Sequence, residues 1–130
     1  MIESEYKYRL RDKTATWGIA IDLIIAYEKN LDLDKEKGVI LNYDDTVFLN
    51  SEEKEIIKKA LFFVNKQNSA NDSFHFFVKS VIFNDCDFQK EGLFFATVLW
   101  ATSHFSFEKP SSSYTFNKKD NLYVFDFLKE

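Results

Sequence analysis

Several residue types are scarce in this chain of 130 residues, and each scarcity excludes a class of protein. The single cysteine, Cys86, has no partner for an internal disulfide, which is typical of a reducing compartment. Three glycines and one proline leave no glycine-lined loop for a phosphate group. We therefore expect neither a disulfide-stabilised fold nor a nucleotide-binding loop, and no cofactor.

Long apolar segments are also missing. No run of residues approaches the roughly 18 apolar residues that a membrane-spanning helix needs. Residues 1–5 are acidic and lack the basic and then apolar order of a signal peptide. These two absences predict a cytoplasmic protein.

The charge balance is mildly acidic. The chain has 21 acidic and 17 basic residues, which gives a net charge of −4. Broad nucleic-acid binding usually depends on an excess of clustered Lys and Arg, so this balance argues against it. A basic protein partner suits it better, because opposite charge speeds encounter.

Phenylalanine is the residue type that the chain has in excess. It occurs 15 times, within an apolar fraction of 45%. Large rings bury much area at a low cost in side-chain entropy, and 130 residues suffice for a core without disulfides or metal. We expect a single domain over residues 1–130.

The clearest pattern lies in residues 74–105. Residues 74–83 are apolar on both faces, which is typical of a strand inside a sheet. Phe74, Phe76, Val78 and Ile82 are assigned to one face, and Phe77, Val81 and Phe83 to the other. An acidic turn at 84–87 follows, and then a helix that we expect from Phe88 to Phe105, with Asp87 as its N-cap.

The remaining elements complete an α+β order. Strands are predicted at 5–12, 16–28, 39–41, 114–116 and 122–127, and a helix at 52–66 behind a capping box of Asn50 and Glu53. Residues 16–28 also fit a helical stripe, but their unbroken alternation favours a strand. The order β-β-β-α-β-α-β-β predicts a two-layer α+β sandwich, with a mostly antiparallel sheet of five to six strands and both helices on one face.

Residues that could carry out catalysis are poorly placed. Cys86 precedes the second helix and His104 ends it, about 25 Å away at ~1.5 Å per residue. His75 is about as far, near the other end of the preceding strand. A Cys–His pair is therefore not expected, and a carboxylate or metal-dependent enzyme of unknown type remains an alternative.

Acidic residues gather in three turns, at 30–37, 42–45 and 84–87. They are Asp32, Asp34, Glu36, Asp44, Asp45, Asp85 and Asp87. The first turn is not an EF-hand calcium loop, because Gly38 falls one position late and Tyr43 stands where the bidentate Glu belongs. We interpret these turns as contacts for a protein partner, with Tyr43 as an anchor, and we expect no metal.

Basic residues alternate in one strand. Lys7, Arg9 and Arg11 alternate with Tyr6, Tyr8 and Leu10. Solvated edge charges that discourage aggregation are the simpler interpretation. Aromatic residues interleaved with cations also suit single-stranded RNA, so an RNA- or ribosome-associated domain is the second hypothesis.

The arrangement of elements from residue 17 to 105 resembles a known domain. The long strand at 17–27, the strand at 39–41, the helix at 51–66, the strand at 74–83 and the acidic segment at 85–91 are similar to domain IV of bacterial elongation factor G, which has the ribosomal S5 domain 2-like fold. The glycine-bearing loop of that domain is replaced here by Asp32, Asp34, Lys35, Glu36 and Lys37. No functional motif is matched, so the resemblance implies the fold and no activity.

A small, acidic, aromatic-rich single domain without a catalytic set suits a non-enzymatic protein-binding module. The sharpest form of this hypothesis is a bacterial immunity or antitoxin-like protein that neutralises a cognate toxin by occluding it. The oligomeric state is open, because apolar strands can pair edge to edge.

Overall fold

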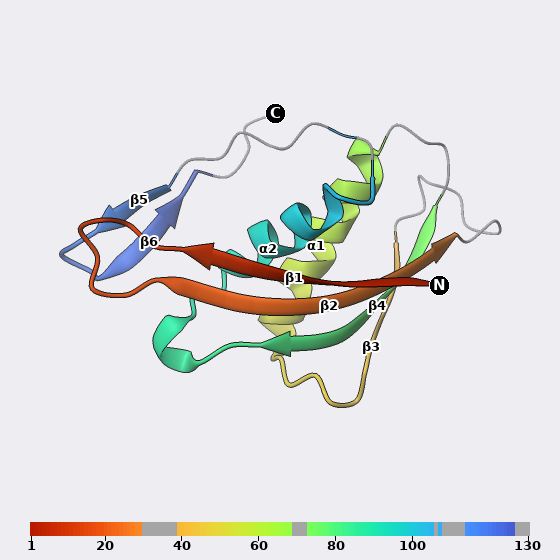
Figure 1. Cartoon of the computed structure of the whole chain (residues 1–130), viewed down its shortest axis with the longest axis horizontal. Coiled ribbons are helices and arrows are strands. Elements are labelled where there is room, and N and C mark those ends of the chain that lie inside the picture. The colour runs from red at the N-terminus through yellow and green to blue at the C-terminus, as the bar shows by residue number, and fades with distance from the viewer. Residues whose placement is uncertain (30–38, 69–72, 106, 108–113, 127–130) are drawn as a thin grey trace.

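The predicted order of elements is confirmed in the computed structural model (Figure 1), which describes residues 1–29, 39–68, 73–105, 107 and 114–126. The elements are β1 (Ile2–Leu10), β2 (Ile19–Lys29), β3 (Ile40–Tyr43), α1 (Ser51–Gln67), β4 (Phe74–Ile82), α2 (Gly92–Ala101), β5 (Tyr114–Asn117) and β6 (Leu122–Phe125). Within the described ranges, no helix has the length and apolar character needed to cross a membrane.

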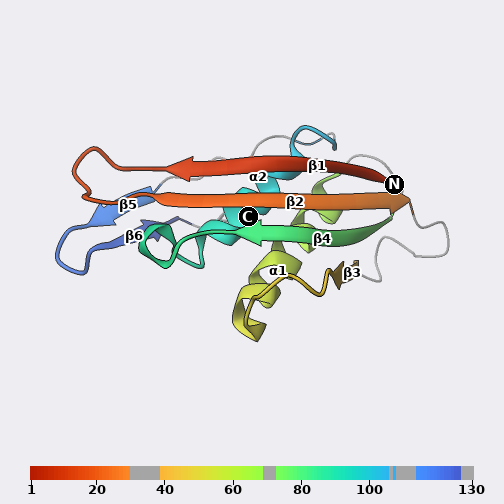
Figure 2. The same cartoon turned by 60° about the horizontal axis from the view of Figure 1, so that its bottom comes forward.

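The fold is an α+β sandwich with both helices on one face of the main sheet (Figures 1 and 2). The strand order is β1-β2-β4-β3, in which β2 is antiparallel to β1 and β4, while β3 is parallel to β4. The expected sheet of five to six strands has four, because β5 and β6 pair with each other as a separate hairpin.

Most of the ambiguous residues 16–28 form a strand, as the alternation predicted, although β2 begins only at Ile19. Every odd-numbered side chain from residue 19 to 27 of β2 is buried beneath the helices, namely Ile19, Ile21, Leu23, Ile25 and Tyr27. β2 and β4 are the two inner strands, which also confirms the interior position predicted for β4. The core therefore lies between these two strands and the helices.

A β-bulge in β4 overturns one predicted face. Ile25 lies opposite Val78 and Ile24 opposite Ser80, so Lys79 is an extra residue in its strand. Past the bulge the alternation reverses. Val81 packs against the core, opposite Leu23, whereas Ile82 is 63% exposed instead of lying on the face of Phe76.

Helix α1 begins with the predicted capping box. The Asn50 side chain accepts a bond from the Glu53 N–H at 2.8 Å, and the Glu53 carboxylate accepts one from the Asn50 N–H at 2.9 Å. Its inner face buries Ile57, Ala60, Leu61 and Val64. These two bonds satisfy backbone donors that the first turn would otherwise leave free.

Helix α2 is shorter than predicted, and Asp87 is not its cap. Asp85–Asp87 form a separate 3-10 turn, after which Phe88 is extended and its ring stacks on Phe83 at 3.7 Å. The helix starts only at Gly92, four residues beyond Phe88, with no side-chain cap bond. It is apolar all round because it packs against the sheet and against its neighbour α1, with eight of its ten residues buried.

The β5–β6 hairpin is fastened at one end of the sheet (Figure 1) by Tyr123. The Tyr123 hydroxyl donates to the Trp17 carbonyl oxygen at 2.7 Å and accepts from the Asp12 N–H at 3.0 Å. The Gln89 side chain donates to the Tyr123 carbonyl oxygen at 2.6 Å and accepts from its N–H at 2.9 Å. The hydroxyl bonds hold the hairpin to the turn between β1 and β2, and the Gln89 bonds hold it to the segment before α2.

Replacing Asn50 with Ala should lower the free energy of unfolding by about 0.5–2 kcal/mol, because the cap bond to the first turn of α1 is lost. Chemical denaturation measures the change. Glu53→Gln is the matched control, since a glutamine side chain also completes a capping box and should cost much less. Equal stability of Asn50→Ala and the wild type would contradict the assigned role.

Replacing Gly92 with Val should cost about 1–3 kcal/mol of stability through overpacking. A Cβ atom at this position would stand 3.0 Å from Ile19 Cγ2 and 3.2 Å from Ile21 Cδ1. Gly92→Ala, with one methyl group, should cost less than Gly92→Val. Denaturant unfolding of the three proteins checks the order, and an unaltered midpoint for Gly92→Val would show that the helix can move away.

Candidate functional site

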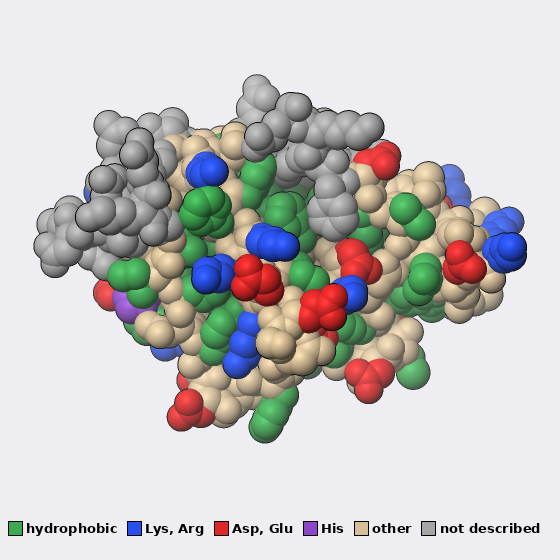
Figure 3. Space-filling view, turned by 180° about the vertical axis from the view of Figure 1, so that it is seen from behind, with side chains coloured by type: hydrophobic (Ala, Val, Ile, Leu, Met, Phe, Trp, Pro, Cys, Tyr) green, Lys and Arg blue, Asp and Glu red, His purple; other side chains and the backbone are tan. Residues whose placement is uncertain are grey.

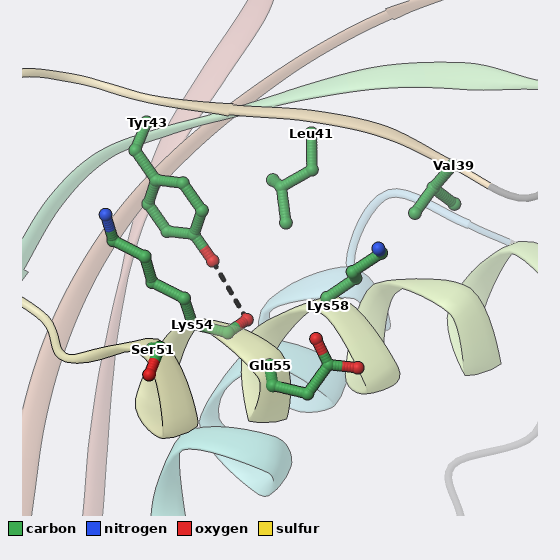
Figure 4. Close-up of a pocket in the computed structure, with 7 residues that line it drawn as sticks. All are labelled: Val39, Leu41, Tyr43, Ser51, Lys54, Glu55 and Lys58. Carbon is green, nitrogen blue, oxygen red and sulfur yellow. Dashed lines mark hydrogen bonds between the residues drawn. The ribbon is translucent and has the colours of Figure 1, made fainter.

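A groove runs between the edge strand β3 and helix α1. Val39, Leu41 and Tyr43 alternate along the chain, so their side chains point to the same side, toward the helix (Figure 4). They form an apolar wall that is only partly buried against the core. In the described part of the chain, β4 is the only strand that pairs with β3, which leaves the other backbone edge of β3 open beside the groove.

The opposite wall comes from one face of α1. Ser51, Lys54, Glu55 and Lys58 line it, at the three- and four-residue spacing that brings helical side chains together. The volume of this open groove is about 290 Å³. The groove therefore combines apolar side chains from the strand with a polar, mixed-charge rim from the helix.

Tyr43 ties the two walls together. Its hydroxyl donates to the Lys54 carbonyl oxygen at 3.1 Å, and the Lys54 ammonium lies 5.1 Å from the centre of its ring. Burial, and then the nearby Glu55 carboxylate, raise the pKa of the Tyr43 hydroxyl above its ordinary value. The hydroxyl therefore remains a donor at neutral pH. The residue predicted as a partner anchor thus joins the strand wall of the groove to the helix wall.

Two of the predicted acidic residues adjoin this end of the groove. Asp44 and Asp45 directly follow Tyr43 and are exposed. The Asp44 carboxylate accepts from the Thr46 N–H at 3.0 Å and from the Thr46 hydroxyl at 2.8 Å, and these bonds lower the pKa of Asp44. Asp44 is therefore ionised at neutral pH.

The other predicted acidic residues do not join them. Asp85 and Asp87 lie beyond the far end of β4, whereas β3 pairs only with residues 75–78 of that strand. Asp87 instead lines a small notch of about 140 Å³ with Asp22 and Arg9. Asp32, Asp34 and Glu36 lie outside the described residues. Asp22 was missed because a single carboxylate in an apolar strand gives no sequence signal.

The basic row of β1 is exposed, as predicted, but it does not form a positive patch. Arg9 pairs with the Asp22 carboxylate at 2.8 Å. Glu3 and Glu5 alternate with the same period as Lys7 and Arg9 and are also exposed. Within β1 the row therefore carries two charges of each sign, and Arg11, the third predicted cation, follows the end of the strand and is exposed. Figure 3 likewise shows both signs interspersed on the helix side of the molecule.

The two histidines contact residues other than Cys86. His75 Nε2 lies 2.6 Å from the Asn42 amide nitrogen, and His104 contacts Ser4. Cys86 is exposed and lines a shallow pocket with Trp17 and Phe88. Among the described residues, no three His, Cys, Asp or Glu side chains gather as metal ligands.

A serine–histidine pair that sequence reasoning missed lies between β1 and the end of α2. Ser4 Oγ is 2.6 Å from His104 Nε2, and it accepts the Trp100 indole N–H at 2.9 Å. Because the indole can only donate, Ser4 Oγ is the acceptor of the Trp100 bond, and its own proton is available to His104 Nε2 when the ring is neutral and protonated at Nδ1. Ser4 and His104 are 100 positions apart, so no local pattern could pair them.

Burial lowers the pKa of His104 below its ordinary value of 6.5. The His104 ring therefore binds a proton more readily in the unfolded chain than in the folded one. Its contribution to the free energy of unfolding is fully present above pH 6.5 and is lost as the pH falls toward the folded-state pKa. Denaturation at a series of pH values should show this decline, and His104→Gln should flatten it. His75→Gln is the control. An identical pH slope in wild type and His104→Gln would contradict this assignment.

Comparison with known proteins supports the fold alone. No family model matches the chain, and no curated protein matches its sequence. A crystal structure of an elongation factor G-like protein from Thermus thermophilus aligns with 75% of this chain, with a TM-score of 0.54 and 18% sequence identity. The match supports the predicted resemblance in part: this chain shares its fold with a portion of that elongation factor G-like protein. The chain spans 14% of the length of that protein, so no activity follows from the match.

Proposed function

We propose that this chain is a non-enzymatic protein-binding domain that receives an extended segment of its partner in the groove between β3 and α1. The observation that carries the proposal is an open strand edge directly beside an apolar groove. Extended peptides bind at such places by adding a strand to the edge, while alternate side chains enter the groove. The backbone bonds supply affinity, and the groove supplies selectivity.

The dimensions of the groove suit side chains of a peptide. Its volume of about 290 Å³ lies just below the range of small-molecule pockets, about 300–1,000 Å³. An apolar side chain of the bound segment would contact Val39 and Leu41, and a polar neighbour would meet Lys54 or Lys58 at the rim. The proposed ligand is therefore an extended segment with at least one apolar anchor.

The sharper form of the proposal is neutralisation of a cognate toxin by occlusion. Asp44 and Asp45 stand at the Tyr43 end of the groove, and the chain carries a net charge of −4. A basic surface flanking the docked segment would meet these carboxylates, which favours rapid association. An antitoxin of this kind would cover its target with the groove and the adjoining acidic turn together.

Replacing Leu41 with Lys should abolish partner capture, because it places a charge on the apolar wall of the groove. The measurement is an affinity pull-down from the organism of origin, with mass spectrometry and nuclease-treated samples. Lys58→Glu, at an exposed position on the rim, should weaken capture without touching the core. Val124→Lys, at an exposed position on the hairpin, is the matched control and should leave capture unchanged.

Three outcomes would count against the proposal. A partner captured equally by wild type, Leu41→Lys and Lys58→Glu would place binding elsewhere. Capture that nuclease removes would favour the RNA-associated alternative. A captured protein whose activity the wild-type chain does not inhibit would leave the binding domain standing and exclude the antitoxin form. Circular dichroism of every variant establishes that it is folded.

A further inference from the structure

The outer edge of β1 is long and carries an ordered row of charges. β1 spans nine residues and pairs with β2 on one side, and within the described ranges no strand pairs with its other side. Its exposed row on the face away from the helices reads Glu3, Glu5, Lys7 and Arg9. Long open edges favour association with another strand, unless their side chains prevent it.

The order of these charges is self-complementary. When a second β1 is laid antiparallel beside the first about a twofold axis at Tyr6, Glu3 lies opposite Arg9 of the second copy. In the same register, Glu5 lies opposite Lys7 of the second copy. The twofold axis repeats both pairs, so all four opposed positions join charges of opposite sign. We propose that two copies of this chain associate by antiparallel pairing of their β1 strands in this register.

Other arrangements of the two strands are disfavoured by the same residues. A shift by two positions in one direction places Glu5 opposite itself, and a shift in the other direction places Lys7 opposite itself. A shift by one position would turn the side chains of one strand to the wrong face. Parallel pairing in register would place every charge opposite its own kind. The charge order therefore selects a single register.

The face of β1 that points toward the helices agrees with this register. Ile2 is 53% exposed, although it lies in a regular strand. In the proposed pairing it stands opposite Leu10 of the second copy, and Tyr6 meets Tyr6. An apolar pair and an aromatic pair thus fall opposite one another on this side. The two sheets become one continuous sheet of eight strands, four from each copy, with the helices of both copies on the same side.

The charged row on β1 has an alternative explanation, namely that it keeps the edge strand from pairing with other chains. Such charges protect an edge by repelling or by resisting desolvation when another strand approaches. The Arg9–Asp22 ion pair satisfies one cation within the chain. This ion pair does not remove the charge complementarity between two β1 strands, because Glu3, Glu5 and Lys7 have no ion pair among the described residues. A second copy offers each of them an opposite charge.

Analytical ultracentrifugation of the untagged chain, from low to high micromolar concentration, tests the proposal. The wild type should shift toward twice the monomer mass of 15.4 kDa as the concentration rises. Glu5→Lys and Lys7→Glu, each alone, should weaken the dimer about ten- to a hundredfold, because each places like charges opposite one another at two symmetric positions. Lys119→Glu, at an exposed position on the hairpin, is the control for changed net charge.

Mixing the two variants provides the decisive comparison. Glu5→Lys on one chain lies opposite Lys7→Glu on the other, and the remaining opposed pair is unchanged, so the mixture should recover the wild-type strength of association that each variant alone has lost. A defect in folding would not be repaired by mixing. A wild type that stays monomeric at every concentration would overturn the proposal, as would a mixture that stays monomeric or single variants that dimerise like the wild type. None of these results depends on partner capture in the β3–α1 groove.

Discussion

The close approach of α2 to β2 is the constraint on which the arrangement of this molecule depends. Gly92 lets the first turn of the helix approach Ile19 and Ile21 more closely than a residue with a side chain would allow. The helix can then be apolar on all sides, because the sheet covers one side and α1 covers another. Helix α1 is thereby held over the other half of the sheet, where it forms the second wall of the groove beside β3.

Placing both helices on one face leaves the two edges of the sheet with different properties. β3 is four residues long, and its side chains lead directly into the groove along α1. β1 is nine residues long, and its exposed charged side chains stand in a self-complementary order. A short edge beside a groove suits an extended peptide, whereas a long edge with matched charges suits a second copy of itself. The two proposals therefore use opposite edges.

The sequence carries local information reliably and long-range information poorly. Complete alternation identified β2, and the Asn50–Glu53 spacing located the start of α1, because both signals depend only on near neighbours. The bulge at Lys79 depends on how β4 registers against β2, so the face of Ile82 was assigned wrongly. The Ser4–His104 pair and the groove form where segments distant in sequence come into contact. No rule based on residue spacing predicts such contacts.

The opposite placement of the two edges bears on binding strength. Because β1 and β3 are the two outermost strands of the sheet, a dimer joined through β1 would carry one β3–α1 groove at each far end. The twofold axis relates these two grooves, and neither is covered by the pairing of the β1 strands. A partner with two copies of the docking segment would then bind the second groove as an intramolecular step, at an effective concentration set by the span between the grooves. Self-association at one edge would in this way strengthen recognition at the other without any new contact in the groove itself.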